Sequence, residues 1–107
     1  MLNKLYLDDI RDLPDNSFVL VRSYKEAIEY INNNGIPLYI SFDHDLGIDE
    51  DGELLPSGHD FAKWLVEMDM DNIHKFPDNF TFNVHSANPP GKANIESYIN
   101  NYLKFIK

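Results

Sequence analysis

The sequence predicts an α/β domain built on a four-stranded, mainly parallel sheet with three helices. Short apolar segments typical of strands alternate along the chain with segments whose apolar residues recur every three or four positions, as in amphipathic helices. Each helical segment follows a strand. Because crossovers between parallel strands are right-handed, this order gathers the carboxyl ends of the strands at one edge of the sheet, where open α/β sheets bind ligands.

The two N-terminal strands are predicted to be short. Lys4 to Leu7 is an apolar stretch that ends abruptly at the acidic pair Asp8 and Asp9, and residues 13–17 have the composition of a turn. The β-branched and aromatic run from Phe18 to Arg22 predicts the second strand. We therefore expect a short loop, rather than a helix, between these two strands.

A capping pair marks the start of the first helix. Ser23 and Glu26 have the capping-box spacing, an apolar stripe follows, and the asparagines and glycine of residues 32–35 end the helix. The next apolar run, from Leu38 to Phe42, lies between a proline and the acidic Asp43, which is typical of a strand buried on both faces. It predicts the third strand.

The other two helices flank the fourth strand. Ser57 opens the second helix after a loop over residues 44–56, and Phe80 to His85 alternates apolar with polar residues, as an edge strand does. The third helix has Asn88 as its cap and runs to Ile106 with apolar residues at helical spacing. With the fourth strand at an edge and the acid-flanked first and third strands at the centre, the predicted strand order is 2-1-3-4.

The composition predicts one small acidic domain over residues 1–107. Nine basic and 18 acidic side chains give a net charge of −9, and 43% hydrophobic residues supply enough material for a core. The sequence has no cysteine, which excludes disulfides, thiolate zinc sites and cysteine nucleophiles. The longest apolar run, Phe18 to Val21, is far short of a membrane span, so we expect a soluble, cytoplasmic protein.

Acidic residues are concentrated in one segment. Six of the 18 lie between Asp43 and Glu53, and no lysine or arginine occurs from residue 26 to residue 62. Such a surface repels duplex nucleic acid, whose non-specific binding depends on basic side chains, and attracts a divalent cation. An EF-hand is excluded, because its first and last ligand positions would be Gly47 and Gly58. We expect residues 49–53 to form a solvated loop.

Chemically active side chains follow or precede four of the predicted elements at the same sheet edge. They are Asp8 and Asp9 after the first strand, Asp43, His44 and Asp45 after the third, His59 and Asp60 at the start of the second helix, and His85, Ser86 and Asn88 after the fourth strand. Each alone is as typical of a cap or turn as of a site. Crowded carboxylates, however, are tolerated best when a cation or a proton lies between them.

The predicted ligands of such a cation are Asp9 and Asp43, with Asp8 or Asp45 in addition. Carboxylate oxygens favour Mg²⁺, Mn²⁺ or Ca²⁺, and an imidazole ligand widens the choice to Fe²⁺ or Zn²⁺. Of these cations, we expect Mg²⁺ or Mn²⁺ at the site, with Zn²⁺ as the alternative.

Two segments are candidates for contacts with a phosphate. Arg11 follows the first acidic pair, and residues 88–92 (NPPGK) open the last helix. The latter predict either an anion pocket, formed by backbone N–H groups with the helix dipole and Lys92, or a proline-stiffened helix cap.

At this point the motifs resemble a known family. The acid pair Asp8 and Asp9, Asp43 after the third strand and the hydroxyl residue Ser86 after the fourth are similar to the site of response-regulator receiver domains. In those domains the acid pair and the strand-three aspartate hold Mg²⁺, and that aspartate accepts a phosphoryl group. The resemblance implies these roles for the matching residues here.

A closer resemblance is to cyclic-phosphate processing receiver domains, a receiver-derived family, over nearly the whole chain. It rests on LDDIR at residues 7–11, DHDLG at 43–47, GHD at 58–60 and HSANP at 85–89. It implies a receiver-like, flavodoxin-like three-layer sandwich that binds or hydrolyses a cyclic phosphate. Compared with an ordinary receiver, we expect the first helix to be missing or reduced and the fifth strand with its lysine to be absent, whereas His44, Asp45, His59 and His85 are additions.

Three functions follow from these residues. The first is metal-dependent hydrolysis of a cyclic phosphate, with Asp43 at the cation, His44 or His85 as the proton donor, and Arg11, His59, Ser86, Asn88 and Lys92 at the substrate. The second is a phosphoaccepting receiver, and the third a non-catalytic module that sequesters a nucleotide. Histidines favour hydrolysis, because opening the ring requires a proton for the leaving oxygen.

These residues do not distinguish between several classes of cyclic phosphate. A 2′,3′-cyclic phosphate on an RNA end, a cyclic mononucleotide, a cyclic oligonucleotide and ADP-ribose 1″,2″-cyclic phosphate all present similar chemistry. His74 precedes the fourth strand, away from the predicted site, and is a suitable control.

Overall fold

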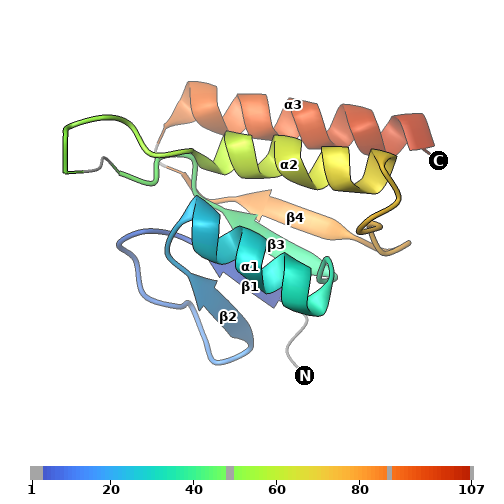
Figure 1. Ribbon diagram of the computed structural model, residues 1–107, viewed down its shortest axis with the longest axis horizontal. Helices are drawn as coiled ribbons and strands as arrows, with labels where there is room; N and C mark the ends of the chain where they lie inside the picture. Colours follow the sequence, from blue (N-terminus) through green and yellow to red (C-terminus); the bar gives the residue numbers. More distant parts are fainter. Residues whose placement is uncertain (1–3, 48–49, 87, 107) are drawn as a thin grey trace.

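A computed structural model describes residues 4–47, 50–86 and 88–106. It contains four strands and three helices (Figure 1): β1 (Lys4–Leu7), β2 (Phe18–Val21), α1 (Tyr24–Asn34), β3 (Tyr39–Phe42), α2 (Gly58–Met70), β4 (Thr81–Val84) and α3 (Pro89–Ile106). The elements and their order are those predicted. Three strands are shorter than predicted, because Arg22, Leu38, Phe80 and His85 lie just outside the sheet ladder.

The four strands form one parallel sheet in the order β2-β1-β3-β4, which confirms the predicted order. In the central pair, Tyr6 of β1 lies opposite Ser41 of β3, and Ser41 lies opposite Asn83 of β4. All four strands point the same way, so the segments that follow them leave the sheet at one edge (Figure 1).

The described helices lie on a single face of this sheet. Helix α1 packs against α2, and α2 packs against α3. Beneath them lies the core, to which the sheet contributes Leu5, Leu7, Ile40, Phe42 and Val84, each at most 1% exposed. The described residues therefore form two layers rather than the three that we expected.

The direction of the crossovers explains the missing layer. From β2 to β3 and from β3 to β4 the chain steps across the sheet in the same direction, so right-handed crossovers place α1 and α2 on the same face. Only the β1–β2 connection steps the other way, and it contains no helix. Along the helix-free face, the ring of Phe18 contacts the rings of Tyr6 and Tyr39 edge to face.

Side-chain caps start the helices at the predicted positions. The Ser23 hydroxyl accepts the N–H of Glu26, and Ser57 and Asp60 form a reciprocal capping box at α2. Asn88 caps α3 by accepting the N–H of Gly91. Because each helix follows a strand, the capped N-termini lie toward the edge where the strands end. No helix within the described ranges is both long and apolar enough to cross a membrane.

A buried carboxylate ties α2 to α3 and to the loop between α2 and β4. Asp69, 1% exposed, accepts hydrogen bonds from the Tyr102 hydroxyl at 2.6 Å, the Phe76 N–H at 2.8 Å and the Lys75 ammonium at 3.0 Å. Burial raises the pKa of Asp69, but these donors outweigh it and hold the pKa below its ordinary value.

We expect Asp69→Ala to lower the free energy of unfolding by about 2–4 kcal/mol in chemical denaturation, because it leaves buried donors without an acceptor. Tyr102→Phe removes one of these bonds and is expected to cost about 1 kcal/mol. Since folding lowers the pKa of Asp69, its stabilisation is present above pH 3.8 and is lost as the pH falls through the folded-state value. An Asp69→Ala penalty that persists undiminished at lower pH would contradict this explanation.

Candidate functional site

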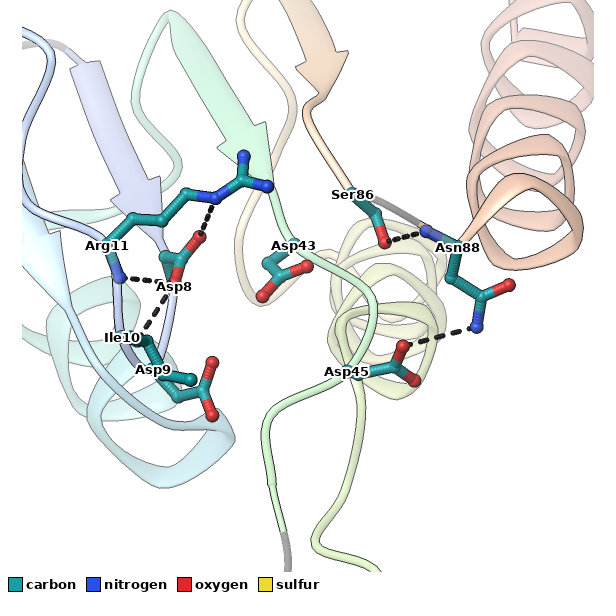
Figure 2. Close-up of a pocket in the computed structure, with 8 residues that line it drawn as sticks. All are labelled: Asp8, Asp9, Ile10, Arg11, Asp43, Asp45, Ser86 and Asn88. Atoms are coloured by element: carbon teal, nitrogen blue, oxygen red, sulfur yellow. Dashed lines mark hydrogen bonds and ion pairs between the residues drawn. The ribbon is translucent and has the colours of Figure 1, made fainter.

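A pocket of about 500 Å³ lies at the carboxyl edge of the sheet. Figure 2 shows its lining, which comes from the segments after three strands: Asp8, Asp9, Ile10 and Arg11 after β1, Asp43 and Asp45 after β3, and Ser86 and Asn88 after β4. Eight side chains from separate parts of the sequence thus meet where the parallel strands end. Seven of the eight are among the predicted site residues, and Ile10 is the exception.

Asp8 is the most enclosed of these residues, at 1% exposure. Its Oδ1 accepts the N–H groups of Ile10 and Arg11 at 2.9 and 2.8 Å, and its Oδ2 lies 2.9 Å from His85 Nε2. Burial raises the pKa of Asp8, but these donors outweigh burial and lower it. Asp8 is therefore a fixed, ionised carboxylate.

Asp43 faces Asp8 and Asp9 across the pocket (Figure 2). Burial, followed by the neighbouring charge of Asp8, raises the pKa of the Asp43 carboxyl. Asp9 Oδ2 lies 3.3 Å from the position that a Cβ on Gly47 would take, so the glycine leaves room for this carboxylate. Three acidic groups thus converge on one space, where their mutual repulsion favours a bound cation.

The donor set fits a divalent cation. A carboxylate oxygen of Asp8, one of Asp43 and a ring nitrogen of His85 all lie within 4.8 Å of one another, and Asp9 lines the same pocket. Because the ring nitrogens of His85 are bonded to Asp8 and Ser41, the carboxylates are the groups available to a cation. Carboxylate oxygens are the ligands that Mg²⁺ and Mn²⁺ prefer. Asp45 does not take part in this group, because its carboxylate turns toward Asn88 (Figure 2) and also bonds to the His44 ring.

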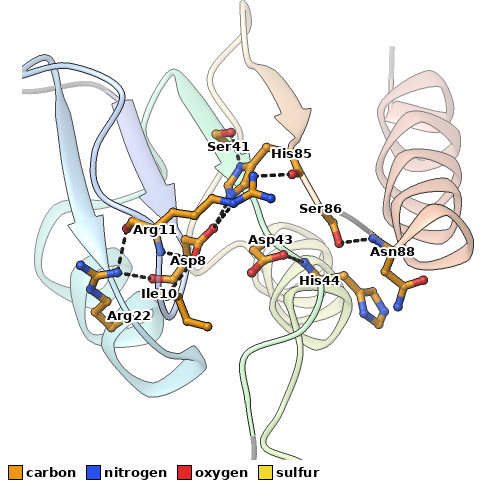
Figure 3. A network of polar contacts seen from close by, with 10 residues as sticks. All are labelled: Asp8, Ile10, Arg11, Arg22, Ser41, Asp43, His44, His85, Ser86 and Asn88. Carbon is orange, nitrogen blue, oxygen red and sulfur yellow. Dashed lines mark hydrogen bonds and ion pairs between the residues drawn. The ribbon is translucent and has the colours of Figure 1, made fainter.

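His44 lies beside the pocket and is paired with Asp45. Its Nδ1 is 2.9 Å from Asp45 Oδ1, and Asn88 Nδ2 donates to Asp45 Oδ2 at 3.2 Å. These two bonds hold the pKa of Asp45 below its ordinary value. Figure 3 shows the His44 ring pointing toward Asn88 and the start of α3 rather than toward Asp8.

Two glycines make room for this arrangement. A Cβ on Gly91 would lie 2.5 Å from Cγ of the His44 ring, and a Cβ on Gly58 would lie 1.8 Å from the carbonyl oxygen of Asp43. Gly58 also donates its N–H to the His44 carbonyl at 2.8 Å. The first turns of α2 and α3 therefore contact the DHD segment (residues 43–45) directly.

The two glycines predict different outcomes on substitution. Gly58→Ala is expected to cost at least about 2 kcal/mol of stability, because the clash is with backbone. Gly91→Ala is expected to change stability by less than about 1 kcal/mol, since the His44 ring can rotate away and alanine favours a helix. Chemical denaturation measures both, and a chemical-shift change of the His44 ring in Gly91→Ala would report the rotation. Equal stability losses in the two variants would contradict this explanation.

Two arginines hold the loop after β1. Arg11 donates to the His85 carbonyl at 2.9 Å and lines the pocket, as a candidate phosphate contact should. Arg22 donates to the Arg11 carbonyl at 2.7 Å and lies 3.7 Å from Asp12. Arg22 was not among the predicted site residues. Its position directly after β2, at the same sheet edge, was the available signal.

The start of α3 does not form the anion pocket that was one of the two predictions for it. Pro89 and Pro90 have no N–H, the N–H of Gly91 donates to Asn88 Oδ1, and that of Lys92 donates to the Asn88 carbonyl. The described first turn therefore has no donor left for a phosphate, and the cap prediction is confirmed. The Lys92 side chain is exposed and does not line the pocket.

The histidines lie in four different environments. His85 bonds to Asp8 and to the Ser41 hydroxyl (Figure 3). His59 contacts the Tyr98 ring edge to face at 5.5 Å, outside the pocket lining, and burial followed by Lys63 lowers its pKa. His74 pairs with Asn32 in the last turn of α1, and neither residue lines the pocket. The acidic loop is exposed at residues 50–53, and Asp49 lies outside the described residues.

The chain matches the family model of the cyclic-phosphate processing receiver domain over residues 3–101. No curated protein matches the chain, and no solved structure does.

Proposed function

Since the chain belongs to the cyclic-phosphate processing receiver domain family, we propose that it binds a cyclic phosphate in the pocket at the carboxyl edge of its sheet and hydrolyses it with the help of a divalent cation. Ring opening adds one water: its oxygen bonds to phosphorus, one ring P–O bond breaks, and the leaving oxygen takes up a proton. The product is a phosphomonoester with a free hydroxyl.

One observation carries this proposal. The carboxylates of Asp8, Asp9 and Asp43 converge on a pocket that also contains the guanidinium of Arg11 and the hydroxyl of Ser86. The three acids are suited to a cation, and a bound cation supplies a Lewis acid that offsets phosphate charge and lowers the pKa of water. Without a cation, the same three acids would repel a phosphate.

Arg11 and Ser86 are the residues we assign to the phosphate itself. A guanidinium and a hydroxyl both donate hydrogen bonds to phosphate oxygens, and both side chains line the pocket. Asn88 holds Asp45 through its amide and caps α3 through its carbonyl oxygen. We therefore assign Asn88 to positioning rather than to direct phosphate binding.

The leaving oxygen needs a proton donor, and His44 is better suited than His85. In His85 both ring nitrogens have partners, Asp8 and Ser41. In His44 the bond to Asp45 occupies Nδ1 and orients the ring beside the pocket. A histidine–carboxylate pair of this kind is a common form of general acid. We place the proton on His44, with Asp45 as its orienting partner.

A panel of cyclic phosphates tests the proposal. The four classes named above are incubated with protein and Mg²⁺, Mn²⁺ or Zn²⁺, and ³¹P NMR follows the conversion of the cyclic phosphate into a monoester. We expect conversion of at least one class with Mg²⁺ or Mn²⁺, and none after chelation. Binding without conversion across the panel would favour the sequestering module instead.

A phosphoaccepting receiver is the second candidate, and one observation favours it. Asp43 follows β3 and shares its pocket with an acid pair and with Ser86, the arrangement expected of a phosphoaccepting aspartate. A small phosphodonor such as acetyl phosphate distinguishes a phosphoaccepting receiver from a hydrolase. Intact-protein mass spectrometry would detect a stable adduct on Asp43, and such an adduct would favour the receiver over the hydrolase.

A further inference from the structure

A line of hydrogen bonds runs from the middle of β3 to the pocket. Ser41 Oγ lies 2.7 Å from His85 Nδ1, and His85 Nε2 lies 2.9 Å from Asp8 Oδ2 (Figure 3). All three side chains are enclosed: Ser41 is 4% exposed, and the side chains of His85 and Asp8 are 11% and 2% exposed.

The strand register places the three residues together. Side chains alternate between the faces of a sheet, so Tyr6 and Asp8 share the helix-free side with Ser41, which lies opposite Tyr6. His85 continues the alternation of β4 on that same side. The His85 ring stacks on the Tyr6 ring, with centroids 4.4 Å apart and planes inclined by 3°. Its backbone N–H also donates to the Phe42 carbonyl. The imidazole is thus held at its face and at both nitrogens.

The direction of the hydrogen bonds follows from their partners. Oδ1 of Asp8 already accepts two backbone N–H groups, and the carboxylate has no proton to donate, so His85 Nε2 carries the hydrogen. In a neutral imidazole Nδ1 is then an acceptor, and the Ser41 hydroxyl must donate to it. Every bond points toward the pocket, from hydroxyl to imidazole to carboxylate.

We propose that Ser41 is a positioning residue, which through His85 fixes the orientation of the Asp8 carboxylate in the cation site. The cation site that Ser41 would support rests on the proposed function, whereas the hydrogen bonds from Ser41 to His85 and from His85 to Asp8 do not. Hydrogen-bond partners behind metal ligands typically change metal affinity by about 10- to 100-fold when they are removed. His85 accordingly serves to hold Asp8, whereas the sequence suggested it as a proton donor.

The test compares wild type, Ser41→Ala and Asn83→Ala. Asn83 is the matched control, because it lies beside Ser41 on the same face of the sheet, is exposed, and is not part of the line of bonds. Calorimetry measures Mn²⁺ affinity, and ¹⁵N NMR of the imidazole ring at about pH 8, above the ordinary histidine pKa, measures which nitrogen of His85 carries hydrogen.

In the wild type we expect the hydrogen on Nε2. In Ser41→Ala we expect the hydrogen to stay on Nε2, where the Asp8 carboxylate accepts it, the ¹⁵N signal of Nδ1 to shift because that nitrogen has lost the hydrogen bond from Ser41, and Mn²⁺ binding to be weakened by roughly 10-fold. Asn83→Ala is expected to be unchanged in all these respects. A wild-type His85 with hydrogen on Nδ1 would overturn the inference, whether or not the variant folds, and so would wild-type Mn²⁺ affinity in a folded Ser41→Ala. If the wild type binds no Mn²⁺, the proposed function loses its cation. The NMR comparison of wild type with Ser41→Ala still decides whether Ser41 holds the His85 ring.

Discussion

Replacing Asp43 with Asn is expected to abolish cyclic-phosphate hydrolysis and, at the same time, to raise the melting temperature of the cation-free protein. The loss of activity is expected to be roughly 10³-fold or more, because a cation at the phosphate supplies several kcal/mol of charge stabilisation and Asp43 is one of its ligands. The gain in stability is expected because the charge of the Asp43 carboxylate is unfavourable in the folded protein, and asparagine carries no charge.

Burial and the charge of Asp8 raise the pKa of Asp43 in the folded protein. A group whose pKa rises on folding opposes the folded state at every pH where it is ionised in the unfolded chain, so an amide that carries no charge removes this penalty above pH 3.8. Calorimetric scans at neutral pH, with chelator and with Mn²⁺, measure the effect. We expect Asp43→Asn to melt higher than wild type with chelator, and Mn²⁺ to raise only the wild type.

Asp15→Asn is the control for this prediction. Asp15 lies in the β1–β2 loop, where bonds from Ser17 lower its pKa. The same chemical change there removes a favourable carboxylate and leaves the pocket intact. A lower melting temperature for Asp43→Asn than for wild type in chelator would show that repulsion does not dominate at Asp43.

Removal of the His44 ring is the second large effect that we expect. A general acid typically contributes about 10²- to 10⁴-fold in rate, so His44→Ala is expected to reduce turnover by that factor. Mn²⁺ affinity should stay near that of wild type, because His44 is not among the ligand atoms gathered around Asp8 and Asp43.

His74→Ala provides the matched control, since His74 pairs with Asn32 and lies outside the pocket lining. Asp45→Asn gives a second check: it removes the charge that orients His44 and is expected to lower turnover less than His44→Ala. Full activity in His44→Ala would show that another residue donates the proton.

Most of the strands and helices could be predicted from the sequence, because the residues that mark each element lie within or next to that element. The capping serines, the alternation before His85 and the apolar run ending at Asp43 each mark an element within a few residues. The layer arrangement was predicted incorrectly, since it depends on the direction in which each crossover steps across the sheet. The predicted strand order contained that direction, but the family resemblance suggested three layers.

For the site, the sequence predicts which residues gather but not how they pair. Seven of the eight residues that line the pocket could be named in advance, because parallel strands bring their ends to one edge. The rotation of Asp45 toward Asn88, and the enclosure of His85 between Ser41 and Asp8, depend on side-chain contacts over more than 40 positions of the chain. No local pattern encodes such contacts.

The most direct test of a cation-dependent hydrolase at this pocket is a ³¹P NMR time course on the cyclic phosphate that the panel identifies. It compares wild type with Mn²⁺, wild type with chelator, and Asp43→Asn with Mn²⁺. We expect monoester in the first sample alone. Equal conversion in all three, or conversion in none of them with a stable phosphoryl adduct on Asp43, would contradict it.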